Sequence, residues 1–437
     1  MYYMIHPTKG LQGDVKIPGS KSGTARGIVL GTLAKGTSRI LNPMPGIDSY
    51  SIIDCCRSLG AKINCESDDE WIIEGIGQEN LKPPAAVFDV GNSGTGYYIL
   101  TALTAMINGK TVVTGDYQIC YRPIAPLLSA IREMGGQAIS TRDNELAPLL
   151  IGGPVEGGHT VHLPGRNVQW SIGLMVCSPM LAGDTRIVID NVGERPYIDL
   201  TLDWLKAAGI EVQNIDNYKE FYVRGGQTYH SFTKKAPCDW CGATYPMVAA
   251  AITPGSRIKL LGMDIHDFQG EKVFVEIIND MGGKVEVLNG GQDGVIIEGG
   301  HPLHGIEIDC TNMPDAIPAL AVLGSYAQSG VTKLTGITAC RMKETDRCKS
   351  IVQELSKMGG KFEETSDTLT IYPSKLRGAT LYGHDDHRIV MASTVAALGA
   401  EGDSLIDSVE HVGVSFPRFY EEMKGIGANI VRLKEDA

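Results

Sequence analysis

The sequence predicts an α/β protein of two domains, built from six copies of one repeating unit. Its 437 residues exceed what a single hydrophobic core usually holds, so two or more domains are expected. The hydrophobic content of 43% and charged content of 21% are ordinary for a globular chain. One signature also returns along the whole chain: a helix-like run ends in an apolar residue and is followed by glycine and a strand-like run.

The glycine of this signature occurs six times at nearly constant spacing. Glycine suits the position after a helix where the backbone needs a positive φ, which explains why each helix would end there. The separations lie between 68 and 77 residues, so the signature predicts six αβ units. The six positions are Gly60, Gly135, Gly209, Gly282, Gly359 and Gly427.

Six units suit two domains of three units each. We expect the chain to cross between the domains near Gly19–Lys21 and again near Lys234–Asp239. One predicted domain therefore comprises residues 20–237, and the other combines residues 1–19 with residues 238–437. Domain junctions are places where ligand clefts tend to form.

Composition and charge exclude several classes of protein. No apolar run approaches the roughly 20 residues of a membrane-spanning helix, and the first residues do not resemble a signal peptide. The net charge of −12 argues against a nucleic-acid binder but allows a small anionic ligand. Ten cysteines make no disulfide framework, and Cys238 and Cys241 lack the second pair of a zinc site. We expect a cytoplasmic monomer with free thiols.

The first segment that indicates chemistry is Pro18–Arg26. It lies between a strand-like run and an apolar helix-like run, which is the layout of a turn that leads into a helix N-terminus. Backbone amides and the helix dipole attract anions there, and Lys21 and Arg26 add full positive charge. An ordinary capped helix with two solvated cations is the alternative. The spacing of a P-loop is absent.

Four other segments offer groups suited to an anionic ligand. Gly91–Gly96 links a short strand to a helix, so its amides can line an anion site. Arg122 precedes a proline suited to a first helical turn. Residues 341–347 mix both charges, and a solvated helix face on which Lys343 and Arg347 are neighbours is the alternative. His384–Arg388 enters an apolar run and favours a helix start with an inward Arg388 over a metal site.

These segments together resemble the 5-enolpyruvylshikimate-3-phosphate synthase family of enolpyruvyl transferases. The resemblance covers residues 5 to about 430 and implies two domains, each of three βαβαββ units, that close on the substrates. The UDP-N-acetylglucosamine branch is disfavoured, because Ser22 stands where that branch has asparagine. The motifs, in the family's order, are Pro18-Gly19-Ser20-Lys21-Ser22 with Arg26, Gly91-Asn92-Ser93-Gly94-Thr95, Arg122-Pro123, Pro196-Tyr197-Ile198-Asp199, Pro314-Asp315-Ala316, Lys343-Glu344-Thr345-Asp346-Arg347 and Asp386-His387-Arg388.

The resemblance implies transfer of the enolpyruvyl group of phosphoenolpyruvate to a ring hydroxyl of a cyclic carboxylate, without metal or cofactor. It also implies a role for each matching residue. Lys21, Asp315, Lys343 and Glu344 would be catalytic, with Glu344 delivering a proton to the methylene carbon. Phosphoenolpyruvate would be bound by Lys21, Gly94, Arg122, Gln169, Arg347 and Arg388. The acceptor would be bound by Ser22, Arg26, Gln169, Tyr197, Asp315 and Lys343.

Several positions depart from the family pattern. Asn167 and Val168 replace a pair of serines that bind the acceptor's 3-phosphate, and Glu194 replaces a third. A carboxylate repels a phosphate dianion, so this pattern suggests a changed acceptor that lacks the phosphate. Three further departures are Ala339 for an asparagine, Tyr98 for an arginine and Val414 for a lysine that closes over phosphoenolpyruvate. The last two also allow a non-catalytic homologue that only binds an anion. A structural repeat protein would leave the inward acids and arginines unexplained.

Overall fold

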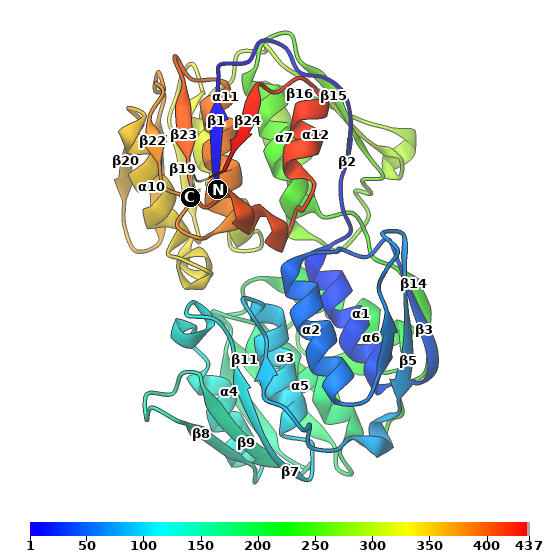
Figure 1. Ribbon diagram of the computed structural model, residues 1–437. Coiled ribbons are helices and arrows are strands. Elements are labelled where there is room, and N and C mark those ends of the chain that lie inside the picture. Colours follow the sequence, from blue (N-terminus) through cyan, green and yellow to red (C-terminus); the bar gives the residue numbers. More distant parts are fainter. Residues whose placement is uncertain (435–437) are drawn as a thin grey trace. The chain divides into compact units, whose positions relative to one another are not determined.

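The computed structural model describes residues 1–434. The chain forms two compact units (Figure 1). The first unit combines Met1–Pro18 with the chain from Cys238 onward, and the second comprises Gly19–Pro237. No helix within residues 1–434 is long and apolar enough to cross a membrane.

Each unit contains three four-stranded sheets, and all six described sheets share one pairing pattern. The outer strand is parallel to the second, and the second, third and fourth strands pair antiparallel. In the second unit the sheets are β14 (Thr233–Lys235), β3 (Lys35–Leu41), β5 (Glu70–Ile76) and β4 (Lys62–Asn64); β6 (Phe88–Asp89), β7 (Gly109–Thr114), β9 (Leu149–Gly153) and β8 (Gln137–Ser140); β10 (Thr160–Pro164), β11 (Thr185–Asp190), β13 (Glu220–Val223) and β12 (Val212–Asn214).

The first unit takes strands from both ends of the chain. Figure 1 shows β1, in blue, between β23 and β24 in orange and red. Its sheets are β2 (Gln12–Lys16), β15 (Arg257–Leu261), β17 (Gly294–Glu298) and β16 (Lys284–Val287); β18 (Glu307–Asp309), β19 (Thr332–Thr335), β21 (Thr368–Tyr372) and β20 (Lys361–Glu364); β22 (Thr380–Leu381), β23 (Ser404–Ile406), β1 (Tyr2–Ile5) and β24 (Ile430–Leu433). The predicted α/β repeat fold is confirmed.

The helices fall into two kinds. Helices that are apolar or small on every side are buried almost throughout, as expected for central helices. These are α1 (Lys21–Leu33), α3 (Gly94–Thr104), α5 (Gln169–Cys177), α7 (Trp240–Ile252), α9 (Ile317–Ser325) and α11 (His387–Leu398). Outer helices expose one face and are α2 (Ile47–Ser58), α4 (Ala125–Glu133), α6 (Arg195–Ala207), α8 (Phe274–Asp280), α10 (Arg347–Lys357) and α12 (Phe419–Gly425).

The six glycines of the repeated signature all end helices in the way the sequence predicts. Their φ angles lie between 78° and 109°, the region that side chains disfavour. Short 3-10 helices connect other segments. They are η1 (Gln78–Asn80), η2 (Ile119–Tyr121), η3 (Ser178–Met180), η4 (Gly270–Val273), η5 (Asn289–Gly291), η6 (Pro314–Ala316), η7 (Thr338–Met342) and η8 (Val409–Val414).

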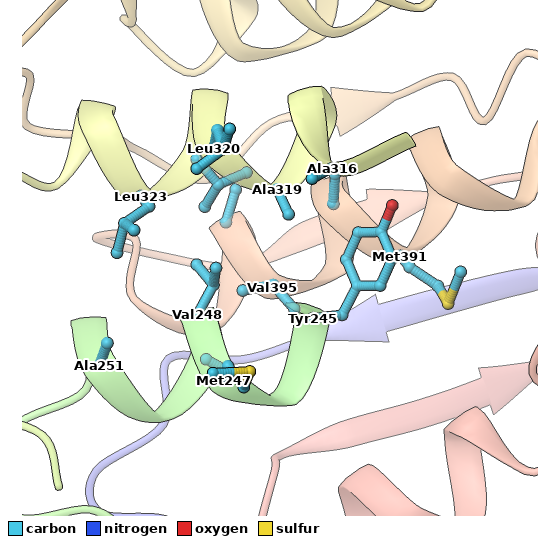
Figure 2. Close-up of a cluster of buried hydrophobic side chains, with 14 of the residues drawn as sticks. Tyr245, Met247, Val248, Ala251, Ala316, Ala319, Leu320, Leu323, Met391 and Val395 are labelled. Atoms are coloured by element: carbon cyan, nitrogen blue, oxygen red, sulfur yellow. The ribbon is translucent and has the colours of Figure 1, made fainter. Parts of the chain in front are cut away.

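Three central helices pack against one another in the core of the first unit. Figure 2 shows Val248 of α7, Leu320 of α9 and Val395 of α11 among the buried apolar side chains that these helices share. The early residues of the three segments lie together at one side of the view, and Ala251 and Leu323 lie at the other. The helices therefore run in the same direction, and their positive N-terminal ends gather at one end of the unit.

Candidate active site

In the second unit, the N-terminus of α1 holds the first predicted residues. Ser20 is the N-cap, because its side chain accepts a hydrogen bond from the Gly23 amide at 3.3 Å. Lys21 follows it, and its Nζ lies 3.1 Å from Oδ2 of the buried Asp48. This ion pair fixes the ammonium group beside the free amides of the helix end, where an anion would bind.

Arg26 contacts Ser22 and Tyr197, which were predicted to bind the same substrate as Arg26. Its Nε donates to Thr201 Oγ1 at 2.7 Å, and its two other nitrogens donate to the carbonyls of Ser22 at 2.8 Å and Tyr197 at 3.4 Å. Burial lowers the pKa of Arg26 to about 10, which still leaves it charged at neutral pH. The structure therefore brings Ser22, Arg26 and Tyr197 together, with Arg26 only 1% exposed.

Gly94 and Arg122 are in direct contact. A Cβ atom on Gly94 would lie 2.0 Å from Arg122 Nη1, so only glycine allows the guanidinium to lie over this helix end. Ser93 caps α3 by accepting from the Gly96 amide at 3.2 Å. Arg122 itself follows η2 and is buried. The guanidinium and the first turn of α3 thus form one cationic site.

The carbonyl of Pro123 links Arg122 to α3 and α5. It accepts hydrogen bonds from the Tyr98 hydroxyl at 3.3 Å and from Trp170 Nε1 at 3.1 Å. The expectation that this proline opens a helix is wrong, because α4 begins at Ala125 and has another proline in its first turn. Tyr98, where the family pattern has an arginine, therefore supports the segment that carries Arg122.

Gln169 begins α5, next to Trp170. Its backbone amide donates to Asn167 Oδ1 at 3.1 Å. Its side-chain Oε1 is buried without a hydrogen-bond partner among the described residues. Asn167, Val168 and Glu194 are all buried. None of these three side chains offers a hydroxyl group to a phosphate.

In the first unit, Arg347 joins three carboxylates from separate segments. Its Nε lies 2.8 Å from Asp386 Oδ2, and its Nη1 donates to Asp315 Oδ1 at 2.6 Å. Its Nη2 donates to Glu344. Burial alone would lower the pKa of Arg347, but the charges of the three carboxylates hold that pKa well above its usual value. The structure therefore brings Asp315, Glu344 and Arg347 together.

Lys343 lies in the connection between η7 and α10. The interpretation of residues 341–347 as one charged helix face is wrong, because η7 ends at Met342 and α10 begins at Arg347. Asp346 separates them as the N-cap of α10, accepting from the Lys349 amide at 3.1 Å. Lys343 Nζ lies 4.0 Å from Asp315 Oδ1, within the range of an ion pair.

Arg388 enters the first turn of α11 and points inward, as predicted. Asp386 caps this helix by accepting from the Arg388 amide at 2.9 Å. The guanidinium lies with its Cζ 6.0 Å from the ring of Tyr245, a distance typical of a weak cation–π contact. Its Nε and Nη1 are buried and have no hydrogen-bond partner among the residues described. An anion would supply acceptors for both nitrogens.

Sequence reasoning missed several acids and a thiol in these sites. Nothing in the sequence around Asp48 or Asp239 indicates more than the start of a helix. Glu271 and Cys241 are distant from Asp315 in the sequence, and the fold brings them close to it. Asp386 was part of a motif, and its role as the N-cap of α11 agrees with the helix start predicted there. Each unit thus presents cations at helix N-termini, and the first unit adds acids that can exchange protons.

Comparisons with known proteins agree with this chemistry. The family described as EPSP synthase (3-phosphoshikimate 1-carboxyvinyltransferase) matches residues 5–423. A relative from Acetivibrio thermocellus named 3-phosphoshikimate 1-carboxyvinyltransferase is 42% identical over 418 residues, with 96% of each chain covered. A relative of the same name from Methanocaldococcus jannaschii is 39% identical over 436 residues, covering 98% of this chain and 99% of its own.

Solved structures show the same architecture. EPSP synthase from Acinetobacter baumannii superimposes with a TM-score of 0.84 at 28% identity, covering 98% of this chain and 99% of that one. The enolpyruvyl transferase NikO from Streptomyces tendae has a TM-score of 0.78 at 18% identity, covers 98% of both chains and supports the fold alone. With matches over nearly its whole length in sequence and in structure, the chain belongs to the EPSP synthase family.

Proposed function

We propose that this chain transfers the enolpyruvyl group of phosphoenolpyruvate to a ring hydroxyl of shikimate 3-phosphate and releases phosphate. The observation that supports this most is that two relatives of this name match at 39–42% identity over nearly the full length. The residues that the resemblance assigns to catalysis, Lys21, Asp315, Lys343 and Glu344, are all present in the chain. Both units provide cations at helix N-termini, which suits a ligand with several negative charges.

We assign the binding of phosphoenolpyruvate to the six residues that the family resemblance implies. The contacts within each unit support the assignment. Gly94 and Arg122 form one cationic site, and Gln169 is joined to it through Pro123 and Trp170. Arg388 has two buried nitrogens that an anion could satisfy. The full set is Lys21, Gly94, Arg122, Gln169, Arg347 and Arg388.

We assign the acceptor to Ser22, Arg26, Gln169, Tyr197, Asp315 and Lys343. Asp315 or Lys343 takes the proton of the acceptor hydroxyl as its oxygen bonds to the central carbon of phosphoenolpyruvate. Glu344 gives a proton to the methylene carbon in the same step, forming a tetrahedral intermediate. Loss of phosphate and return of the proton to Glu344 then restore the double bond.

Three buried residues favour a second candidate acceptor. Asn167 Oδ1 is engaged by the Gln169 amide, Val168 has no polar group, and Glu194 brings a carboxyl group. These side chains suit a cyclic hydroxy acid without the 3-phosphate better than they suit a phosphate dianion. Shikimate 3-phosphate and unphosphorylated shikimate should therefore be compared directly. Turnover of shikimate 3-phosphate alone would eliminate the second candidate.

Phosphate release from phosphoenolpyruvate tests the proposal. We expect release that depends on the acceptor and is unaffected by a chelator. Lys21→Ala and Glu344→Gln should each lower kcat by at least about 100-fold. Lys62→Ala and Glu401→Gln, which change exposed side chains, should leave kcat unchanged. Binding of phosphoenolpyruvate without phosphate release in a single turnover would instead indicate a non-catalytic anion-binding homologue.

We also propose that the chain acts as a cytoplasmic monomer with domain boundaries near residues 19 and 238. The two compact units support such boundaries. Sedimentation at several protein concentrations tests the monomer, because a self-associating chain would sediment faster as its concentration rises.

A further inference from the structure

A buried carboxyl group lies behind Asp315 and has no role in the chemistry above. Glu271 belongs to η4 and is only 2% exposed. Its Oε1 is buried and has no hydrogen-bond partner among the described residues. One oxygen of Glu271, one of Asp315 and the sulfur of Cys241 all lie within 4.8 Å of one another. Glu271 is thus a buried acid close to a proposed catalytic residue.

The position of Glu271 is fixed by the residue that precedes η4. Gln269 accepts a hydrogen bond from the Trp240 amide at 3.0 Å and donates to the carbonyl of Cys238 at 2.7 Å. These two bonds attach η4 to the start of α7. Glu271 therefore cannot turn outward to water without breaking contacts of the core.

Among the ionisable groups that face Glu271, the acids outnumber the cations. On its own element, Lys272 donates to the carbonyl of Asp267 at 2.7 Å, and the neighbouring Glu276 of α8 is exposed. Burial, followed by the charge of Asp315, raises the pKa of Glu271 to about 8, although a hydrogen bond with the Cys241 side chain, a backbone hydrogen bond and the charge of Arg388 act in the opposite direction. The ionisable groups that face this cluster are Asp239 and Cys241 of the α7 start, Tyr245 of α7, Asp315 of η6 and Arg388 of α11.

We propose that Glu271 is a positioning residue that stands behind Asp315 as a neutral carboxylic acid, so that Asp315 holds the single negative charge of the pair. Two carboxylates this close, one of them fully buried, raise the pKa of one member of the pair. The charge belongs on Asp315, because Arg347 donates to it at 2.6 Å and Lys343 is nearby. Ionised Glu271 would repel Asp315 and compete for its cations. The inference rests on the proposed function, which assigns Asp315 to the acceptor.

The first test compares the melting temperature of the parent protein with that of Glu271→Gln between pH 5 and pH 9.5. Glutamine has the shape of the neutral acid and does not titrate. The folded pKa of Glu271 is raised, so the folded state retains a proton that the unfolded chain loses. The parent should therefore lose stability relative to the variant as pH rises from about 4.5 to about 8, with no further change above. Exposed Glu276→Gln should show no such dependence.

The second test measures the KM for the acceptor at pH 7 and pH 9. One pH unit above its pKa, about a tenth of the Glu271 side chains keep the proton, so the KM of the parent should rise about tenfold more than that of Glu271→Gln. At pH 7 the variant should retain kcat within about threefold, because its side chain is neutral like that of the parent. A purely structural role would not separate KM from kcat in this way.

Three outcomes would overturn the inference: a melting difference that is flat with pH, the same alkaline rise of KM in both proteins, or loss of activity at pH 7 in a folded variant. If Glu271→Gln does not fold, Asp315→Asn decides, because removal of that charge should move the loss of stability to lower pH. An unchanged pH range in Asp315→Asn would also overturn it. A pH-dependent melting difference in a protein that releases no phosphate would refute the proposed function and leave the protonation of Glu271 established.

Discussion

Arg347 contacts three carboxylates that come from three different segments of the first unit. Buried carboxylates are costly unless a cation compensates them, so the guanidinium holds these segments together. It is 1% exposed, and its nitrogens contact Asp315, Glu344 and Asp386. Arg347 therefore organises the acids of this part of the first unit.

Replacing Arg347 by methionine should destabilise the first unit strongly. The buried Asp386 and the partly buried Asp315 and Glu344 would lose their cation, at a cost of about 3–5 kcal/mol in the free energy of unfolding. Urea unfolding at pH 7 measures this loss.

The matched control is Arg39→Met. Arg39 pairs with Glu70 at 2.9 Å on the surface of the second unit, so its loss should cost less than about 1 kcal/mol. Equal losses in the two variants would contradict the role given to Arg347.

Gly94→Ala should weaken binding of phosphoenolpyruvate with little effect on stability. The added methyl group would meet Arg122 Nη1 at 2.0 Å, and the flexible end of that side chain would move away. We expect the KM for phosphoenolpyruvate to rise about tenfold, which corresponds to about 1.4 kcal/mol of lost binding. Steady-state kinetics measures this change, and Gly425→Ala, where nothing lies within 4 Å, should leave the KM unchanged.

At the scale of elements, the helix ends obey local rules. Gly135 lies in the connection between α4 and β8 of the second repeat, and its φ is 86°. No atom outside its chain neighbours lies within 4 Å of a Cβ placed there. Gly135→Ala should therefore cost about 1–2 kcal/mol through backbone strain alone. Chemical denaturation measures it. Gly425→Ala again serves as the control, since its φ is not positive, and an equal effect in both would exclude a backbone cause.

Local rules explain which elements the sequence could predict. The six glycines and the start of α11 depend on residues a few positions apart, and the structure agrees with them. The helix face drawn through Lys343 and Arg347 was wrong, because Asp346 caps a new helix there. An aspartate directly before an amphipathic run is typical of an N-cap, so the start of α10 could have been predicted. The four-residue spacing of Lys343 and Arg347 favoured the wrong interpretation instead.

The contacts of the site could be predicted only in part. The family motifs name Arg347, Asp315 and Glu344, but no local pattern pairs Arg347 with an aspartate 39 residues away. Glu271 follows no motif and reaches Asp315 because η4 is attached to the start of α7. Such proximity results from the packing of distant segments, which a single sequence does not encode in short patterns.

At the scale of the whole molecule, the two units differ in how the chain builds them. The second unit is continuous from Gly19 to Pro237 and has its own buried core. The first unit needs residues from both ends of the chain, because β1 lies between β23 and β24 and β2 pairs with β15. A break near the unit boundaries should therefore affect the two units unequally.

We expect a fragment of residues 19–237 to fold alone, with a cooperative thermal transition by circular dichroism. A fragment of residues 238–437 should not, since the sheet of β22, β23 and β24 lacks its connecting strand. Joining residues 1–18 through a flexible linker after residue 437 should restore folding. Cooperative folding of residues 238–437 without that segment would contradict this account.

The placement of β1 also sets an order of events during translation. Tyr2–Ile5 leaves the ribosome long before its partners in β23 and β24 are made. At typical synthesis rates of about 5–20 residues per second, this apolar strand waits roughly 20–90 s with its backbone groups unmatched. The nascent second unit can meanwhile complete itself. During this interval, β1 of the nascent chain is therefore a target for chaperones.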